Sequence, residues 1–201
     1  MGYGFGLINH AAIFSRLKRK NMRGEGTGNI GATNAVIVLG RMYGIIILIL
    51  DILKAFIAYK LAAFLFHSNI FGLFAGLGAM LGHIFPFYMK FKGGKGLAAF
   101  AGTVLAHSPL MFLAILATVF VLLFIVNHSF IVPFAGTVLF SVIATIKAPS
   151  EMLAVGILTG IMALLIIWKH VPNLKKSIIG EDIGVRDYVK KYIFRHKNNE
   201  V

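Results

Sequence analysis

The chain has 201 residues, of which 58% are hydrophobic and 13% are charged, and its mean hydropathy is +0.85. Because a soluble domain usually carries about 25% charged residues, this composition excludes an ordinary water-soluble surface and indicates a chain that uses lipid as part of its solvent. The formal net charge of +13 does not indicate a nucleic-acid partner, because the basic residues lie between apolar segments and near the C-terminus rather than along one amphipathic face.

The apolar segments are continuous rather than alternating, so the predicted fold class is all-α: a multi-pass helical integral membrane protein of about seven transmembrane helices, in one domain over residues 1–201. Crossing a hydrocarbon core of ~30 Å takes about 20 helical residues. Residues 1–17 read as a partial first span, since this apolar segment is short and rich in glycine; a shorter chain and a misassigned start codon both fit. The six later segments are residues 43–66, 71–89, 97–106, 109–126, 130–146 and 152–168.

The basic residues predict how these spans are oriented. With seven crossings, all Lys and Arg residues except Lys54, Lys60 and Lys147 fall on one side of the membrane. The positive-inside rule makes that side cytoplasmic, with the N-terminus outside and the C-terminus inside. The chain then divides into a cytoplasmic loop, a membrane core and a cytoplasmic basic tail, at residues 18–42, 43–168 and 169–201.

The cytoplasmic loop contains the run GTGNIGATN at residues 26–34. Glycines allow backbone N–H groups to approach a ligand closely and form an anion-binding nest. The hydroxyl and amide groups of this run add polarity without charge: Thr27, Asn29, Thr33 and Asn34. A loop rich in turn-forming residues would have the same composition, so both interpretations stay open at this point.

Asp51 and Lys54 lie three residues apart within the second span, on one face of the predicted helix. An ionisable pair inside a membrane is costly, and it is either functional or a mutual neutralisation. The spacing favours the structural pair.

The third polar segment is GHIFP at residues 82–86, followed by FKGGKG at residues 91–96. Lys92 and Lys95 are separated by glycines directly before a predicted helix, which combines ammonium groups with free N–H groups and suits a phosphate. The spacing is not that of a Walker A loop. Basic anchoring at the cytoplasmic surface is the alternative.

His170 and Asn173 follow at the cytoplasmic end of the last span. A histidine at a membrane interface fits a simple amphipathic rim residue, but the predicted topology brings this one to the same mouth as both glycine loops. The residues alone therefore predict an anion pocket at the membrane surface for a phosphate-bearing substrate that meets lipid, where position and electrostatics do most of the catalysis.

Taken in order, GTGNIGATN, Asp51-x-x-Lys54, GHIFP–FKGGKG and WKHVPNL–IIG resemble the PlsY family of bacterial glycerol-3-phosphate acyltransferases over nearly the whole chain. The resemblance implies a seven-span enzyme of the bacterial inner (plasma) membrane with its site at the cytoplasmic face. It implies acyl transfer from acyl phosphate to the 1-hydroxyl of sn-glycerol 3-phosphate, which forms lysophosphatidic acid without a metal or another cofactor. The implied partners are these two substrates, membrane lipid and a soluble enzyme that produces acyl phosphate, and nucleic acid is not among them.

The resemblance also implies site residues. Thr27 stands where the family has a substrate-binding serine, Lys95 matches a lysine that holds phosphate, and His170 and Asn173 match a His-x-x-Asn pair of the active site. These four are the implied catalytic residues, and the substrate's own phosphate is the implied base. The expected substrate-binding residues are Gly28, Asn29, Arg41, His83, Lys92, Gly93, Gly94 and Gly96.

The chain departs from the family pattern at Ile37, where the family has an arginine. Arg41 lies four residues on, so within one helix it would sit one turn further along the same face, and the hypothesis is that it partly substitutes. Asn21 and Leu7 also differ from the usual residues. Two alternatives stay open: a catalytically degenerate paralogue that serves as a binding or assembly subunit, and a small transporter of an anionic metabolite.

Overall fold

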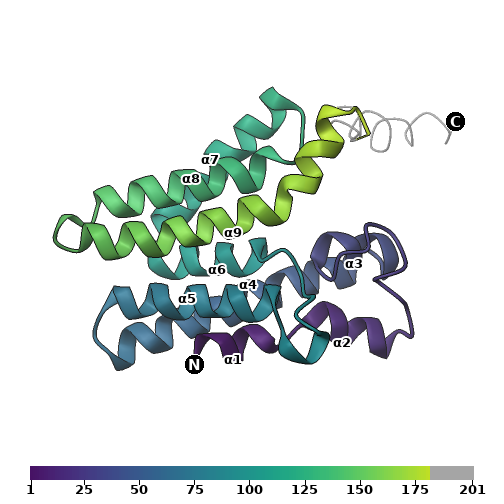
Figure 1. Cartoon of the computed structure of the whole chain (residues 1–201), viewed down its shortest axis with the longest axis horizontal. Coiled ribbons are helices and arrows are strands. Elements are labelled where there is room, and N and C mark those ends of the chain that lie inside the picture. Colours follow the sequence, from purple (N-terminus) through teal and green to yellow (C-terminus); the bar gives the residue numbers. More distant parts are fainter. Residues whose placement is uncertain (182–201) are drawn as a thin grey trace, which may run out of the picture.

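The computed structural model describes residues 1–181, and every regular element in that part of the chain is a helix, so the all-α prediction is confirmed. Figure 1 shows α8 and α9 side by side above α4, α5 and α6, with all five running along the long axis of the molecule. The elements are α1 Gly2–Leu7, α2 His10–Leu17, α3 Ala32–Val38, α4 Arg41–Leu65, α5 Asn69–Ile84, η1 Phe87–Met89, α6 Leu97–His107, α7 Pro109–Val126, α8 Ile131–Ile146, η2 Pro149–Glu151 and α9 Met152–Ile178.

Three segments of the described chain are helical, long and apolar enough to cross a membrane: Asn69–Met89, Pro109–Val126 and Pro149–Ile178. Helices α6 and α8 are apolar but shorter. Helix α4 has 25 residues, which is about the length of a full crossing, and it carries Asp51, Lys54 and Lys60. The count of seven crossings and their orientation stay predictions.

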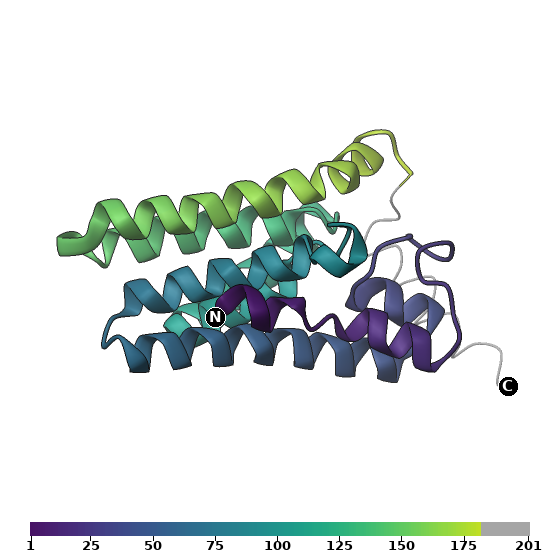
Figure 2. The same cartoon turned by 60° about the horizontal axis from the view of Figure 1, so that its bottom comes forward.

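Residues 1–17, the predicted partial first span, contain two helices rather than one, and their place in the membrane stays a prediction. The chain forms α1 and α2, with a break at Ile8 and Asn9. The side chain of Asn9 is buried and its Oδ1 accepts a hydrogen bond from the N–H of Ala12 at 2.9 Å, which starts α2 as an N-cap. Figure 2 shows α1 lying between α5 and α4, with α2 continuing toward the end of the molecule that carries the long loops.

The glycines of α1 serve close helix packing. A methyl group at Gly6 would overlap the carbonyl oxygen of Ala79 and lie 2.8 Å from the Cα of Gly82 on α5. Small residues let the two backbones approach each other, as is common between helices in membranes, where packing rather than water exclusion drives association.

Two boundaries near the end of the molecule that carries the glycine loops also differ from the prediction. Helix α9 continues to Ile178, ten residues beyond the predicted end of the last span, so His170 and Asn173 lie on a helix rather than in a tail. The loop predicted at residues 18–42 contains α3. The rest of the predicted tail, from residue 182, lies outside the described residues.

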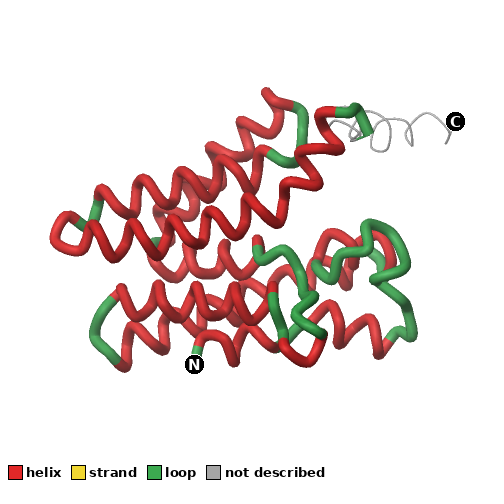
Figure 3. Tube along the Cα trace, in the orientation of Figure 1, coloured by secondary structure: helices red, strands yellow, loops and turns green. Residues whose placement is uncertain are grey.

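The loops of functional interest gather at one end of the molecule. In Figure 3 the loop between α2 and α3, the loop between η1 and α6, and the end of α9 all lie at the same end, while the connections α4–α5 and α8–η2 lie at the other. This arrangement agrees with the sequence-based expectation that the polar glycine loops share one mouth.

The packing of α1 on α5 gives a stability prediction. We expect Gly6→Ala to lower the apparent Tm of the purified protein in detergent, because the added methyl group cannot fit against α5, a misfit that costs about 1–3 kcal/mol. Gly4→Ala is the matched control in the same helix, since a methyl group there meets nothing within 4 Å and alanine favours a helix by about 1 kcal/mol over glycine. Equal Tm values for the two variants would contradict this account of the packing.

Candidate active site

The first glycine loop is organised by Asn34, which is fully buried. Its Oδ1 accepts a hydrogen bond from the N–H of Thr27 at 2.7 Å, and its Nδ2 donates to the carbonyl oxygens of Met22 and Glu25 at 2.7 and 3.2 Å. Thr27 Oγ1 accepts a hydrogen bond from the N–H of Asn29 at 3.4 Å. The exposed Thr27 is therefore held by a buried amide beneath it.

The glycines of this loop are required by its backbone. Gly26 and Gly28 have φ angles of +61° and +71°, a region that residues with a Cβ rarely adopt. A methyl group at Gly26 would also overlap the Oδ1 of Asn34. The glycine content of this loop is thus explained by its conformation and does not by itself indicate a ligand.

The second glycine loop packs against the end of α5. The N–H of Gly93 donates to the carbonyl oxygen of Ile84 at 2.9 Å, and the N–H of Gly94 donates to that of His83 at 3.1 Å. The expectation of free N–H groups at Gly93 and Gly94 is therefore wrong: these glycines allow close packing, and their donors are already used. Gly96, with φ +86°, is the N-cap residue of α6 and provides no side-chain cap, so the first N–H groups of α6 have no helical partner.

Lys95 connects this loop to the last helix. Its ammonium donates to Oδ1 of Asn173 on α9 at 2.5 Å, which leaves two of its three N–H donors for another acceptor. Burial lowers the pKa of Lys95 below its ordinary value of 10.5, and repulsion by Lys176 lowers it further. The structure thus brings together Lys95 and Asn173, two of the four implied catalytic residues.

His170 lies three residues before Asn173, on the same face of α9, and is 5% exposed. Its Nδ1 lies 2.8 Å from the carbonyl oxygen of Ile166. Because a carbonyl oxygen can only accept, Nδ1 is the donor, and the neutral ring keeps a lone pair on Nε2. His170 is therefore able to accept a hydrogen bond from a substrate.

The first loop contacts the second loop. A guanidinium nitrogen of Arg23 donates to the carbonyl oxygen of Lys92, and a methyl group at Gly94 would lie 2.7 Å from the carbonyl oxygen of Ile30. A cavity of about 400 Å³ lies between α2, the first loop and η1, and Arg23 is one of its basic lining residues, with Arg16 and Lys90. Arg23 thus carries positive charge to the meeting point of the two loops.

Three implied site residues are placed differently from the expectation. Arg41 begins α4, whereas Ile37 belongs to α3, and Gly40 separates the two helices with φ +100°. The premise that both lie on one face of one helix is wrong. Among the described residues, Thr27 is hydrogen-bonded to Asn29 of its own loop and to Asn34 of α3, and not to the second glycine loop or α9. His83 is buried, with its Nδ1 facing Lys54 at 2.9 Å.

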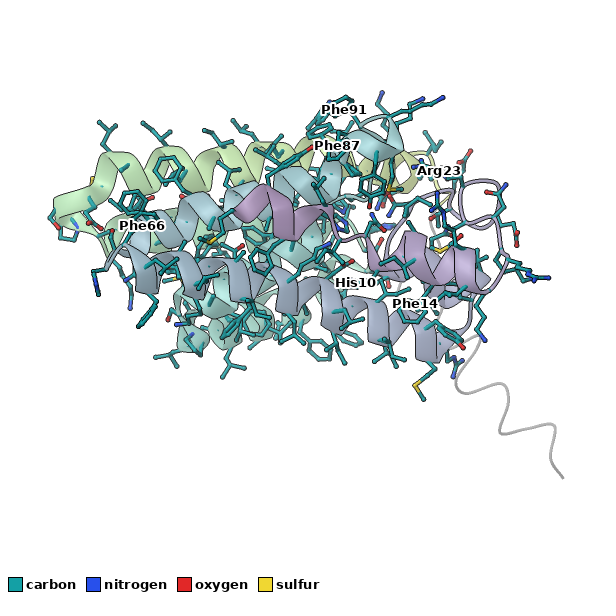
Figure 4. All side chains as sticks on the ribbon, turned by 90° about the horizontal axis from the view of Figure 1, so that it is seen from below. His10, Phe14, Arg23, Phe66, Phe87 and Phe91 are labelled. Carbon is teal, nitrogen blue, oxygen red and sulfur yellow. The ribbon has the colours of Figure 1, made fainter. Side chains whose placement is uncertain are left out.

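Sequence reasoning does not single out Arg23 or Asn34 as organising residues. The sequence indicates Asn34 only as one of the uncharged polar groups that could face a ligand, and its partners lie 7 to 12 residues earlier. The partner of Arg23 lies 69 residues later in the chain. Figure 4 shows Arg23 toward the loop end of the molecule, with Phe87 and Phe91 in the same half and Phe66 toward the other end.

Aromatic side chains surround the mouth. Phe87 and Phe91 are 58% and 60% exposed. Phe85 stacks on Trp168 with ring centroids 6.2 Å apart, and the ammonium of Lys169 lies within 5 Å of both rings. Exposed aromatic and basic residues together are typical of the level of the lipid headgroups.

Comparison with known proteins places these features in a family. Residues 1–180 match the profile of the family described as glycerol-3-phosphate acyltransferase. The glycerol-3-phosphate acyltransferase of Bacillus velezensis is 36% identical over 182 residues, which cover 89% of this chain and 91% of the relative. The enzyme of the same name from Bacillus subtilis is 35% identical over 179 residues, with the same coverage.

Two solved structures are similar to this chain. Both are crystal structures of PlsY, an integral membrane glycerol 3-phosphate acyltransferase, one in its glycerol 3-phosphate form and one in its lysophosphatidic acid form. Their TM-scores are 0.77 and 0.74, each at 29% sequence identity and with 91% of both chains covered.

Proposed function

The chain belongs to the glycerol-3-phosphate acyltransferase family, and from this premise we propose that its acyl donor is an acyl phosphate and that Lys95, Asn173 and His170 form the centre of its active site. The protein is an integral membrane acyltransferase that acylates glycerol 3-phosphate to lysophosphatidic acid. The observation that carries the proposed site is the hydrogen bond between Lys95 and Asn173. It joins the second glycine loop (residues 91–96, called the lysine-glycine loop below) to α9 beside His170.

Phosphate binding at this site rests on Lys95 and on the start of α6. Lys95 keeps two N–H donors beyond the one used by Asn173. The next helix, α6, begins at Leu97 without a side-chain cap, and unpaired N–H groups at a helix N-terminus favour an anion. The loop at Thr27 and Gly28, which are exposed, and Asn29, which is half-buried, offers a hydroxyl and an amide for the second phosphate-bearing substrate.

The proposed reaction needs no covalent intermediate on the protein. The 1-hydroxyl oxygen of glycerol 3-phosphate attacks the acyl carbonyl carbon, the bond from that carbon to the phosphate oxygen breaks, and inorganic phosphate leaves. The hydroxyl proton passes to a phosphate oxygen of the substrate. Nε2 of His170, which keeps a lone pair while Nδ1 donates to Ile166, accepts a hydrogen bond from the non-reacting 2-hydroxyl of glycerol 3-phosphate and so orients the substrate.

We further propose that Arg23, rather than Arg41, supplies the positive charge that Ile37 does not. Arg23 donates to the carbonyl oxygen of Lys92 and so lies directly on the lysine-glycine loop. Arg41 is exposed at the start of α4, beyond the turn at Gly40. A planar guanidinium near a phosphate site suits bidentate binding.

The location of the site follows the charge pattern. The basic residues of the two loops and of α9 lie at the mouth, and the positive-inside rule makes this the cytoplasmic face of the bacterial inner (plasma) membrane. Phe87, Phe91 and Trp168 are exposed there and suit contact with lipid. A soluble enzyme that produces acyl phosphate would then deliver the donor from the cytoplasm.

The proposed donor is tested with purified protein, palmitoyl phosphate and radiolabelled glycerol 3-phosphate. We expect labelled lysophosphatidic acid from the wild type and none from Lys95→Ala, because the variant lacks the ammonium group that binds the negatively charged phosphate of the substrate. Palmitoyl coenzyme A serves as the comparison donor, and product formed only from it would contradict the acyl phosphate proposal. Binding of glycerol 3-phosphate without product from either donor would instead support the degenerate paralogue.

The two arginines give a second prediction. We expect Arg23→Gln to lower kcat/KM for glycerol 3-phosphate by about 10- to 100-fold, which is the range for one hydrogen bond to a charged group. Arg41→Gln is the matched control with the same change of charge, and its kcat/KM is expected to stay within about twofold, as for an exposed surface substitution. The reverse order would restore Arg41 as the substituting arginine.

A third prediction concerns pH. The charged form of Lys95 binds phosphate, so kcat/KM falls as the pH rises through the lysine's pKa, which burial and Lys176 hold below 10.5. Lys176→Gln removes the repulsion and raises the pKa of Lys95, so the alkaline limb of the pH profile is expected to move to higher pH. Lys175→Gln is the control at the neighbouring position, and an identical limb in both variants would exclude Lys95 as the titrating group.

A further inference from the structure

Asp51 and Lys54 on α4 form a buried ion pair, with Lys54 Nζ and Asp51 Oδ1 2.8 Å apart and both residues less than 5% exposed. The pair contacts the break between α1 and α2 on one side. Lys54 donates to the carbonyl oxygen of Ile8 at 2.7 Å, and Nδ1 of His10, labelled in Figure 4, lies 2.9 Å from Asp51 Oδ1.

On the other side, Lys54 determines the state of His83. The ammonium has three N–H donors and no lone pair, and it lies within 3 Å of Asp51 Oδ1, the carbonyl oxygen of Ile8 and Nδ1 of His83. Because Nδ1 faces a donor, it accepts and carries no proton. The proton of the neutral imidazole is therefore on Nε2.

Nε2 of His83 faces the lysine-glycine loop. A methyl group built on Gly94 would overlap Nε2, so the imidazole lies directly beneath the backbone of this glycine. The carbonyl oxygen of His83 also accepts a hydrogen bond from the N–H of Gly94, at 3.1 Å. The ring and the backbone of His83 together support the residue that precedes Lys95.

Stability alone does not explain this arrangement. Removing two charges from water is costly, and replacing a buried ion pair with apolar residues of similar volume is often neutral or stabilising. An ammonium with all three donors used, in contrast, sets the direction of each group around it. Here Lys54 fixes the ring of His83, whose Nε2 faces the loop that carries Lys95.

We propose that Asp51 and Lys54 are positioning residues of the acyltransferase site: they hold His83 with its N–H group beneath Gly94, and this sets the position from which Lys95 reaches Asn173 and a substrate phosphate. The role rests on the proposed function of Lys95. It predicts that loss of the network changes the KM for a phosphate-bearing substrate, because it moves a binding loop.

The test compares amide variants of His83 with variants of α4. In His83→Gln the side-chain amide lies near the place of the imidazole Nε2. In His83→Asn the shorter side chain puts the amide near the place of Nδ1. We expect His83→Asn and Lys54→Gln to raise the KM for glycerol 3-phosphate or palmitoyl phosphate on the order of 10- to 100-fold, since a displacement of about 1 Å can cost that much. His83→Gln is expected to retain a KM closer to that of the wild type than His83→Asn.

Lys60→Gln is the matched control, because Lys60 lies on the same helix, loses the same charge and is exposed. A structural defect that leaves part of the enzyme unfolded lowers kcat and keeps both KM values, so the KM separates positioning from folding. Wild-type KM values for both substrates in Lys54→Gln, whatever its kcat, would overturn the proposal.

A spectroscopic measurement tests the same inference without turnover. In wild-type protein labelled with ¹⁵N-histidine, the signal that disappears in His83→Gln is expected to show a proton on Nε2 only. A proton on Nδ1, or on both nitrogens, would overturn the proposal even if Lys54→Gln cannot be purified. An inactive wild type with the expected signal would count against the proposed function and leave the arrangement of His83 supported.

Discussion

The buried pair of Asp51 and Lys54 is the constraint around which the loop end of the molecule is arranged. An ammonium inside a helical membrane protein must find acceptors for all its donors, and one of those acceptors is the carbonyl oxygen of Ile8. In an uninterrupted helix this oxygen would accept from the N–H of Ala12. Asn9 takes over that N–H with its side chain, so the break between α1 and α2 is what releases the oxygen for Lys54.

The same pair connects the interior to the surface loops through a short series of contacts. His83 accepts from Lys54, the backbone of His83 holds Gly94, and the next residue, Lys95, donates to Asn173 on α9. Close packing stiffens this path: Gly102 of α6 lies so near α4 that a methyl group would overlap the carbonyl oxygen of Ile52. A loop supported in this way can present an ammonium group without rearrangement, which electrostatic catalysis requires.

Much of the helical architecture was predictable, because lipid leaves the backbone few other ways to satisfy its hydrogen bonds. The segment at residues 109–126 coincides with α7, where Ser108 caps the start and Asn127, with φ +65°, ends the helix. Other boundaries were not predictable from apolarity. The apolar run of α9 indicates membrane thickness and says little of how far the helix continues. At the break beside Asn9, the carbonyl oxygen of Ile8 accepts from Lys54, a residue far later in the chain. The N–H groups of Gly93 and Gly94 donate to backbone carbonyl oxygens. Every residue carries such an acceptor, so the sequence alone does not indicate that these donors are used.

The departure at Ile37 shows how a site can be described differently by its sequence and by its structure. A family pattern places a charge at a position in the chain, whereas a phosphate responds to charge at a position in space. Ile37 belongs to the short helix α3 and lies beside Gly26 of the first loop. A methyl group built on Gly26 would lie 3.2 Å from Ile37 Cγ2. Arg23 enters the same loop from its other end and reaches the backbone of Lys92. Because the loop is folded back on itself by Asn34, residues at its two ends lie near one another, and a charge lost from one end can be supplied from the other.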